Sequence, residues 1–285
     1  MENKFFKECY DSNPHFKIHH TIEPGDKHTN PALLHYDDSY VLTYFKKGRG
    51  SIRIDGAFYE INEGDIILIN PDELHLCTVE SGIYHERIAV YIKSSLFKLF
   101  GISPSEFLNV FSEDNLKVIN KSISFSSEYQ LHTYFEKALE TVKKQTQKSE
   151  ICTLCILSEL IYTLGEIPVP QNKETASMRD DPTIKAILKY LNENFKENIT
   201  LENLSEEFFI SKYHLSRLFK ENVGTSIINY IVYKRILNFN SLIREGLSID
   251  KAAFLSGFRN YSNFFKLYKK HMGISPRDYK LSLKK

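Results

Sequence analysis

Hydrophobic residues between positions 199 and 273 recur every three or four residues, in two successive copies of one pattern. Two apolar positions and a closing glycine recur 49 residues later, where Leu215, Phe219 and Gly224 become Phe264, Tyr268 and Gly273. A repeat of this kind predicts one structural unit that is present twice. Each copy reads as two short helices around a tight turn, with Ser211 placed to cap the second helix of the first copy.

The second helix of each copy also carries a polar face opposite the apolar one. Its residues are basic, aromatic or able to form hydrogen bonds: Tyr213, Ser216, Arg217 and Lys220 in the first copy, and Ser262, Asn263, Phe265 and Lys266 in the second. Such side chains suit the base edges in the major groove, so we expect these eight residues to bind DNA. An ordinary solvated face is the alternative for an isolated helix.

The spacing between the two copies favours DNA binding over a solvated face. Residues from Ser226 to about Glu245 form a further helical pattern between them. A helix of this length spans ~30 Å, and successive major-groove faces lie ~34 Å apart. One chain can therefore place both second helices on one side of a duplex, with Tyr233 and Arg235 expected to contact DNA phosphates.

Residues 211–220 resemble the first recognition helix of the AraC/XylS transcription regulators. Gly257-Phe258 and residues 273–279 resemble the second half of the same DNA-binding domain. The resemblance covers roughly residues 182–280. It implies an all-α domain with a double helix-turn-helix, which we place at residues 182–285.

Two positions depart from the family pattern. Where the family usually has a small residue, four positions after Arg235, this chain has Phe239, and the usual phenylalanine of the second recognition helix is Tyr268. Both fall on apolar faces, so the departures concern local packing more than function.

The region from Phe16 to Lys93 predicts short strands, because β-branched and aromatic runs alternate with turn residues. Many short strands at this spacing indicate a sandwich or jelly-roll barrel. A Gly64-Asp65 turn, an apolar strand, Asn70-Pro71 and His75 follow in an order that resembles the cupin sensor domain of many AraC-type regulators. The expected fold class is α+β, with an N-terminal cupin-like β-barrel and a C-terminal all-α domain.

Metal-binding cupins have a His-x-His, a glutamate and a later histidine. The matching positions here are His35, Asp37, Val41 and His75. Because a valine cannot coordinate a metal, we expect no bound metal, no cofactor and no enzymatic activity. A cupin-fold metal enzyme fused to a DNA-binding domain is the disfavoured alternative.

A barrel of this size encloses one small ligand. If Val41 points inward, alternation along the strand directs Thr43 and Phe45 inward as well. The expected effector-binding residues are His35, Thr43, Phe45, Arg53 and His75, which suit a sugar or related metabolite. An ordinary barrel interior is an equal alternative for any one of them, and Phe5-Phe6 reads either as an arm over the mouth or as a tail.

Residues 125–164 read as two helices, and the second is apolar around most of its circumference. Such a helix is buried in its own domain or against a partner. The resemblance favours a homodimer formed through residues 1–165, and core packing is the alternative. Cys152 and Cys155 read as core residues. The proline-containing residues 166–181 read as a linker.

The net charge of +1 conceals an asymmetry. From Pro182 onward there are 18 basic and 9 acidic residues, against 19 and 27 in the preceding part of the chain. A basic domain joined to an acidic one is typical of a DNA-binding domain attached to a domain with another role. No apolar stretch is long enough for a membrane helix, and four cysteines make no disulfide framework, so we expect a cytoplasmic protein.

These patterns predict a transcription regulator in which a small molecule in the N-terminal barrel changes how the C-terminal domains bind promoter half-sites. RNA polymerase is a further expected partner if the protein is an activator. A dimeric regulator that binds DNA without any ligand is the main alternative.

Overall fold

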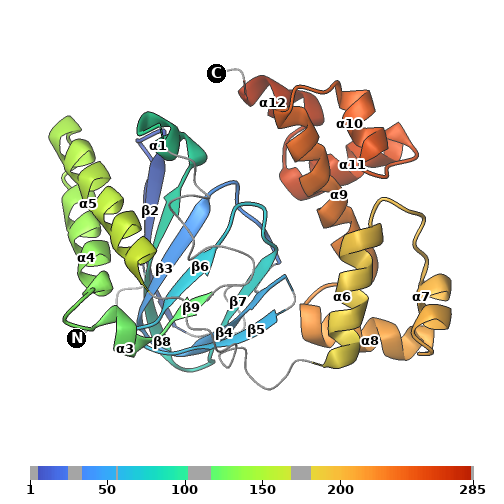
Figure 1. The fold of residues 1–285 in the computed structure, drawn as a ribbon, viewed down its shortest axis with the longest axis horizontal. Coiled ribbons are helices and arrows are strands. Elements are labelled where there is room, and N and C mark those ends of the chain that lie inside the picture. The colour runs from blue at the N-terminus through green and yellow to red at the C-terminus, as the bar shows by residue number, and fades with distance from the viewer. Residues whose placement is uncertain (1–5, 25–33, 56, 102–116, 168–180, 284–285) are drawn as a thin grey trace. The chain divides into compact units, whose positions relative to one another are not determined.

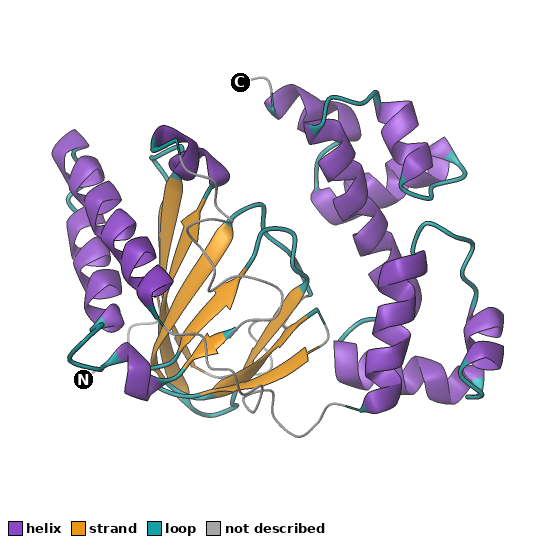
Figure 2. Ribbon diagram, in the orientation of Figure 1, coloured by secondary structure: helices purple, strands orange, loops and turns teal. Residues whose placement is uncertain are grey.

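The computed structural model describes residues 6–24, 34–55, 57–101, 117–167 and 181–283, and the chain divides into two compact units, residues 1–179 and 180–285. The first unit contains strands and helices, and the second contains only helices (Figures 1 and 2). The predicted order of an antiparallel β domain followed by an all-α domain is confirmed. None of the described helices is long and apolar enough to span a membrane.

The strands of the first unit form two antiparallel sheets. They are β1 (Phe6–Tyr10), β2 (Phe16–Pro24), β3 (Tyr40–Lys47), β4 (Gly50–Ile54), β5 (Ala57–Ile61), β6 (Ile66–Ile69), β7 (His75–Val79), β8 (Tyr84–Ile92) and β9 (Val118–Ile119). The large sheet has the order β1-β2-β8-β3-β6-β9 and the small sheet the order β5-β4-β7. Among the described residues the strands therefore pair as a two-sheet sandwich and do not close into one ring.

One face of the large sheet packs against the small sheet. Buried side chains from β3 and β6 meet buried side chains from β4 and β5 in one cluster: Val41, Phe45, Ile67, Ile69, Ile52, Ile54 and Ile61. Since successive side chains of a strand point to opposite faces, the odd-numbered residues of β3 and β6 face the small sheet. The even-numbered residues of these strands face the other way.

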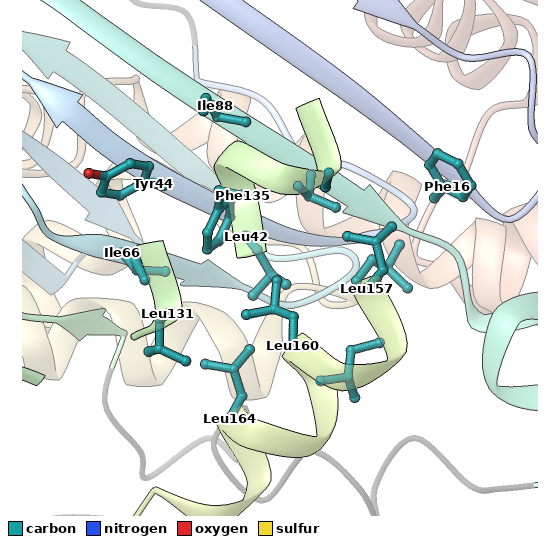
Figure 3. Close-up of a cluster of buried hydrophobic side chains, with 14 of the residues drawn as sticks. Phe16, Leu42, Tyr44, Ile66, Ile88, Leu131, Phe135, Leu157, Leu160 and Leu164 are labelled. Carbon is teal, nitrogen blue, oxygen red and sulfur yellow. The ribbon is translucent and has the colours of Figure 1, made fainter. Parts of the chain in front are cut away.

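The other face of the large sheet is covered by two helices, α4 (Leu131–Val142) and α5 (Gln147–Glu166). Figure 3 shows Leu42, Ile66 and Ile88 of the sheet beside leucines of these helices. On α5 the buried side chains are mainly Leu157, Leu160, Ile161 and Leu164. Core packing, one of the two alternatives for this helix, therefore holds for one side of it. The shorter helices of this unit are α1 (Ser94–Leu99) and α3 (Lys121–Ser124).

The opposite side of α5 is exposed. Ile151 and Tyr162 are 62% and 56% exposed, and both Cys152 and Cys155 are exposed and free. The prediction that these cysteines lie in the core is wrong, because the apolar pattern of the helix continues around the side that the sheet does not cover.

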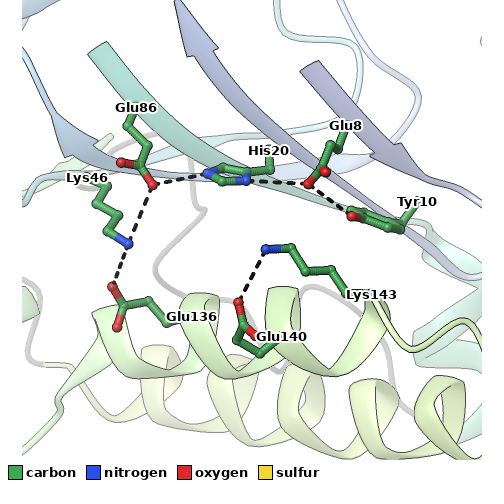
Figure 4. Close-up of polar contacts among 8 residues, drawn as sticks. All are labelled: Glu8, Tyr10, His20, Lys46, Glu86, Glu136, Glu140 and Lys143. Carbon is green, nitrogen blue, oxygen red and sulfur yellow. Dashed lines mark hydrogen bonds and ion pairs between the residues drawn. The ribbon is translucent and has the colours of Figure 1, made fainter. Parts of the chain in front are cut away.

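A line of charged side chains joins the large sheet to α4 (Figure 4). The ammonium of Lys46 lies 3.5 Å from Glu86 on β8 and 3.2 Å from Glu136 on α4. The same Glu86 oxygen lies 3.1 Å from His20 Nε2. These contacts give the helix a polar attachment to the sheet beside its apolar one.

Seven helices make up the described part of the second unit. They are α6 (Pro182–Asn194), α7 (Leu201–Glu207), α8 (Lys212–Val223), α9 (Ile227–Arg244), α10 (Ile249–Leu255), α11 (Tyr261–Met272) and α12 (Pro276–Ser282). The capping prediction for Ser211 is confirmed, since its hydroxyl accepts from the His214 amide at 3.3 Å. The spacer helix expected between the two copies is α9, and Gly224 and Gly273 end α8 and α11 with positive φ.

The two residues that depart from the family pattern, Phe239 and Tyr268, pack against each other. Phe239 and Tyr268 are fully buried, and their ring centroids lie 5.1 Å apart in an edge-on contact. The Tyr268 hydroxyl donates to Asn240 Oδ1 at 2.7 Å. The larger residue on α9 and the phenol on α11 therefore fit one core, and the buried hydroxyl has a partner.

The expectations for the N-terminal segment and for the linker fall partly outside the described residues. Phe5 is outside them, whereas Phe6 begins β1. Residues 168–180 of the expected linker are also outside them.

Candidate functional site: an outward helix face and an enclosed pocket

The first candidate site is the outward face of α8. Leu215 and Phe219 are fully buried and fix the rotation of this helix. That rotation exposes Tyr213, Arg217 and Lys220 and leaves Ser216 half-buried. Tyr213 is 79% exposed, so a phenol, a guanidinium and an ammonium all lie open to a binding partner.

Helix α11 repeats this arrangement. Phe264 and Tyr268 are fully buried, and the residues expected to bind DNA all lie on the exposed side: Ser262, Asn263, Phe265 and Lys266. The structure thus places all eight predicted residues on the outward sides of two equivalent helices. Whether each one contacts a base stays a prediction.

Arg235 has a role that the sequence did not indicate. Its Nε and Nη2 donate to the backbone carbonyls of Phe195 and Glu197, both at 2.7 Å. The guanidinium therefore joins α9 to the loop before α7, and the expected phosphate contact stays a prediction. Its neighbour Tyr233 packs edge-on against His271, with ring centroids 4.6 Å apart.

The same loop meets the turn between α10 and α11. A Cβ added to Gly257 would lie 2.6 Å from the Lys196 carbonyl oxygen and 3.0 Å from Arg235 Nε. Gly257 also has φ of +88°, where side chains are disfavoured. Only glycine therefore fits this junction, where the loop between α6 and α7 meets the turn of the second helix-turn-helix copy.

The second candidate site is a cavity of about 100 Å³ between the two sheets. Its lining comes from seven strands of the two sheets and from the segment before β3: Lys7, His19, Thr21, His35, Val41, Thr43, Ile52, Ile67, Ile69, His75, Cys77, Arg87, Ala89 and Tyr91. Three predicted effector-binding residues, His35, Thr43 and His75, belong to this lining.

The other two predicted effector-binding residues do not line the cavity. Phe45 is fully buried in the sandwich core, where its ring lies parallel to that of His85 with centroids 6.2 Å apart. Ile52 and Ile54 both face the core, so Arg53 between them points away, and its guanidinium lies 5.4 Å from the Phe58 ring centroid. Neither residue is therefore part of the cavity described here.

Several lining residues were missed by the sequence reasoning, notably His19, Arg87 and Tyr91. Arg87 pairs with Thr21 and Phe45, and Tyr91 pairs with Val41, across neighbouring strands. Alternation along β8 places Arg87, Ala89 and Tyr91 on one face, but the sequence does not say which strand lies beside β3. That neighbour relationship was the missing information.

Three potential metal ligands come together at one side of the cavity. The ligand atoms of His35, Asp37 and His75 lie within 4.8 Å of one another. The His75 imidazole is held by a 3.0 Å contact from Nδ1 to the Glu73 carbonyl, and burial, followed by the nearby His35, lowers the pKa of His75 to about 4. Burial also raises the pKa of Asp37.

This donor set has the right chemistry for zinc, and His75 Nε2 lies 3.6 Å from Asp37 Oδ2. A structural zinc site usually has four protein ligands, and the described residues supply three here. Val41 adds only apolar surface to the cavity. The three residues are therefore suited to hydrogen bonding with a ligand in their present positions.

Comparison with known proteins matches both units. Residues 20–105 match an AraC-like ligand-binding domain, and residues 204–282 match a helix-turn-helix domain. The chain is 29% identical over 255 residues to the HTH-type transcriptional regulator YdiP of Escherichia coli, with 87% of this chain and 80% of the relative covered.

Two further relatives are similar over most of their length. The HTH-type transcriptional regulator YbfI of Bacillus subtilis is 28% identical over 237 residues, covering 80% of each chain. The lactose operon transcription activator of Staphylococcus xylosus is 24% identical over 248 residues, covering 84% of this chain and 83% of the relative.

Proposed function

Because this chain belongs to the AraC/XylS family of transcription regulators, we propose that its pocket binds a small polar effector that controls promoter binding. The observation that carries the proposal is the polar lining of the cavity between the sheets, within the segment that matches a ligand-binding domain. Histidines, Thr43 and Tyr91 offer hydrogen bonds, and the isoleucines exclude water. Sugars are one class to test, since one relative is named for the lactose operon.

The DNA-binding part of the proposal assigns the two outward faces to successive major grooves. Tyr213, Ser216, Arg217 and Lys220 read one half-site, and Ser262, Asn263, Phe265 and Lys266 of α11 read the other. Helix α9 has 18 residues and so spans ~27 Å, which is compatible with adjacent grooves on one side of a duplex.

The proposed domain boundaries are residues 1–165 for sensing and dimerisation, 166–181 for the linker and 182–285 for DNA binding. The division of the chain into compact units at residues 179 and 180 supports this arrangement. The exposed apolar side of α5 supports a homodimer. We further propose a cytoplasmic, non-enzymatic protein that works with RNA polymerase where it activates.

Calorimetry of the full chain with a metabolite panel, combined with binding-site selection from random DNA, tests the proposal. A saturable ligand that changes promoter affinity supports the sensor role. Sequence-specific DNA binding that no panel member alters favours the ligand-independent regulator instead. A chain that selects no DNA sequence contradicts the assignment of the two helix faces.

A further inference from the structure

The charged groups that line the cavity are all cationic. Its fourteen lining residues include Lys7 and Arg87 and no aspartate or glutamate. The carboxyl of Asp37 lies behind one side of the lining, 3.6 Å from His75 Nε2, and burial raises its pKa. Burial lowers the pKa of both His19 and His75, so these imidazoles are neutral at pH 7 and act as hydrogen-bonding groups. The positive charge of the cavity wall therefore comes from the lysine and the arginine.

The two cations lie on one side of the cavity. Across the large sheet, Lys7 pairs with Thr21, and Thr21 pairs with Arg87. Paired residues on neighbouring strands point to the same face of a sheet. Lys7, Thr21 and Arg87 thus form a row across β1, β2 and β8, with a hydroxyl between the two charges.

Arg87 is half-buried and has a neutral partner. Its side chain bonds to the Cys77 thiol, and within the described ranges it makes no ion pair with a carboxylate. A guanidinium has five donor hydrogens arranged to match a carboxylate or phosphate. A partly buried arginine is costly without a counter-charge, so this one is suited to an anion from outside the chain.

We infer that the effector is a small organic anion whose carboxylate or phosphate group pairs with Arg87, with Lys7 adding positive charge beside it. This inference rests on the proposed function, because it names the chemical class of ligand for the same cavity. The hydroxyls of Thr21 and Thr43 and the neutral imidazoles bind the polar groups of the rest of the ligand.

The size of the cavity limits the enclosed part of the ligand. Its volume of about 100 Å³ is smaller than the ~150 Å³ engineered cavity that holds benzene. A carboxylate or phosphate with two or three attached carbon atoms suits this space. A longer ligand extends through the mouth of the cavity.

Binding of matched pairs of compounds to the full chain tests the inference, because each pair differs mainly in charge. The pairs are lactate and lactamide, glycerol 3-phosphate and glycerol, and glucuronate and glucose. We expect at least one anion to bind, and its neutral counterpart to bind at least about tenfold more weakly, since charge-assisted hydrogen bonds are the stronger kind. Comparing the affinities for lactate and glycerol 3-phosphate shows whether the site prefers a carboxylate or a phosphate.

Arginine variants locate the binding group. Arg87→Gln should weaken binding of the anion by about tenfold or more, and Arg87→Lys should retain part of the affinity that the glutamine variant loses. Arg53→Gln is the matched control, because Arg53 lies in the same domain but points away from the cavity. Circular dichroism of each variant shows whether the fold is retained, and the lysine variant decides the matter if the glutamine variant unfolds.

Each outcome counts for or against the anionic effector. Equal binding of a neutral compound and its anion overturns it and leaves the effector-sensing function standing. Anion binding that survives Arg87→Gln also overturns it. If no anion binds, the inference fails, and if no compound of either kind binds, the sensor role is weakened as well.

Discussion

Arg217 is the residue of α8 best placed to read a base. It lies between Tyr213 and Lys220 on the exposed side, and its Nε is 4.0 Å from Glu221, which is a weak exposed contact. Its guanidinium therefore remains available for the edge of a guanine.

We expect Arg217→Ala to cost ~1–3 kcal/mol of DNA affinity and to relax the preference at one base position. Selection from random DNA with the wild type and the variant measures both effects. Lys189→Ala, which removes an exposed cation on α6, serves as the control. An unchanged consensus in the arginine variant contradicts the assignment.

Phe265 distinguishes the second recognition helix from the first. It stands where the first copy has Ser216, and it is 38% exposed. A phenyl ring cannot donate a hydrogen bond to a base, but it can contact the methyl group of thymine. We expect a second half-site that is bound more weakly and is rich in A·T pairs, and Phe265→Ala should weaken that preference. A selected site with one block that is unaffected by the substitution would contradict the two-helix mode.

We expect the purified protein to contain no stoichiometric metal. Val41 supplies no ligand, so His35, Asp37 and His75 are three donors where a structural zinc site usually has four, and the nearby cations disfavour another positive charge. Elemental analysis of the full chain is the measurement. One zinc, iron or manganese per chain that is lost on His75→Ala would refute this and would make the enzyme alternative worth reopening.

At the scale of elements, helix α5 has apolar side chains on two sides, one buried and one exposed. One side packs on the large sheet through residues such as Leu157. The other exposes Ile151, Cys155 and Tyr162, which are spaced four and seven residues apart and so share a face. A contiguous apolar stripe of this kind favours contact with a second chain.

We expect Ile151→Glu to weaken the dimer by about 1–2 kcal/mol or more, because a carboxylate in an apolar interface is poorly solvated. Sedimentation of the full chain over a concentration series measures the change. Lys137→Glu, an exposed substitution on α4, controls for the added negative charge. A wild-type chain that sediments as a monomer, or a variant with unchanged dimerisation, counts against this face.

The elements were largely predictable from the sequence, whereas the pocket was predictable only in part. Helix starts are encoded locally, as at Ser211 and Ser226, whose hydroxyls cap α8 and α9. The inward direction of Thr43 followed from alternation within one strand. The position of Arg53 outside the cavity and that of Arg87 in its lining could not be predicted, because the faces of these residues depend on which strands become neighbours, and no local pattern records that pairing.

At the scale of the whole molecule, the two units carry opposite charge. From Pro182 onward the basic residues outnumber the acidic ones by two to one, which suits attraction to the phosphate backbone over long distances. Specificity then depends on few side chains, because contacts with phosphate carry no direct sequence information. In the mode of binding proposed here, charge attracts the protein to DNA, and the outward faces of α8 and α11 select the site.

The junction at Gly257 is expected to fix the spacing of half-sites that the second unit can bind. The Gly257 backbone packs against the Lys196 carbonyl, and Arg235 donates a hydrogen bond to the same loop. These contacts should hold helices α8 and α11 at one separation and one angle. Inserting a single base pair between half-sites turns the second by ~34–36° about the duplex axis. The wild-type protein should therefore bind the lengthened site poorly. In the Gly257→Ala variant the junction is forced apart, so this variant should bind the lengthened site relatively better and the original site less tightly. Affinities for a set of sites with altered spacing measure this dependence on spacing. The same dependence in both proteins would mean that the junction does not fix the distance between α8 and α11.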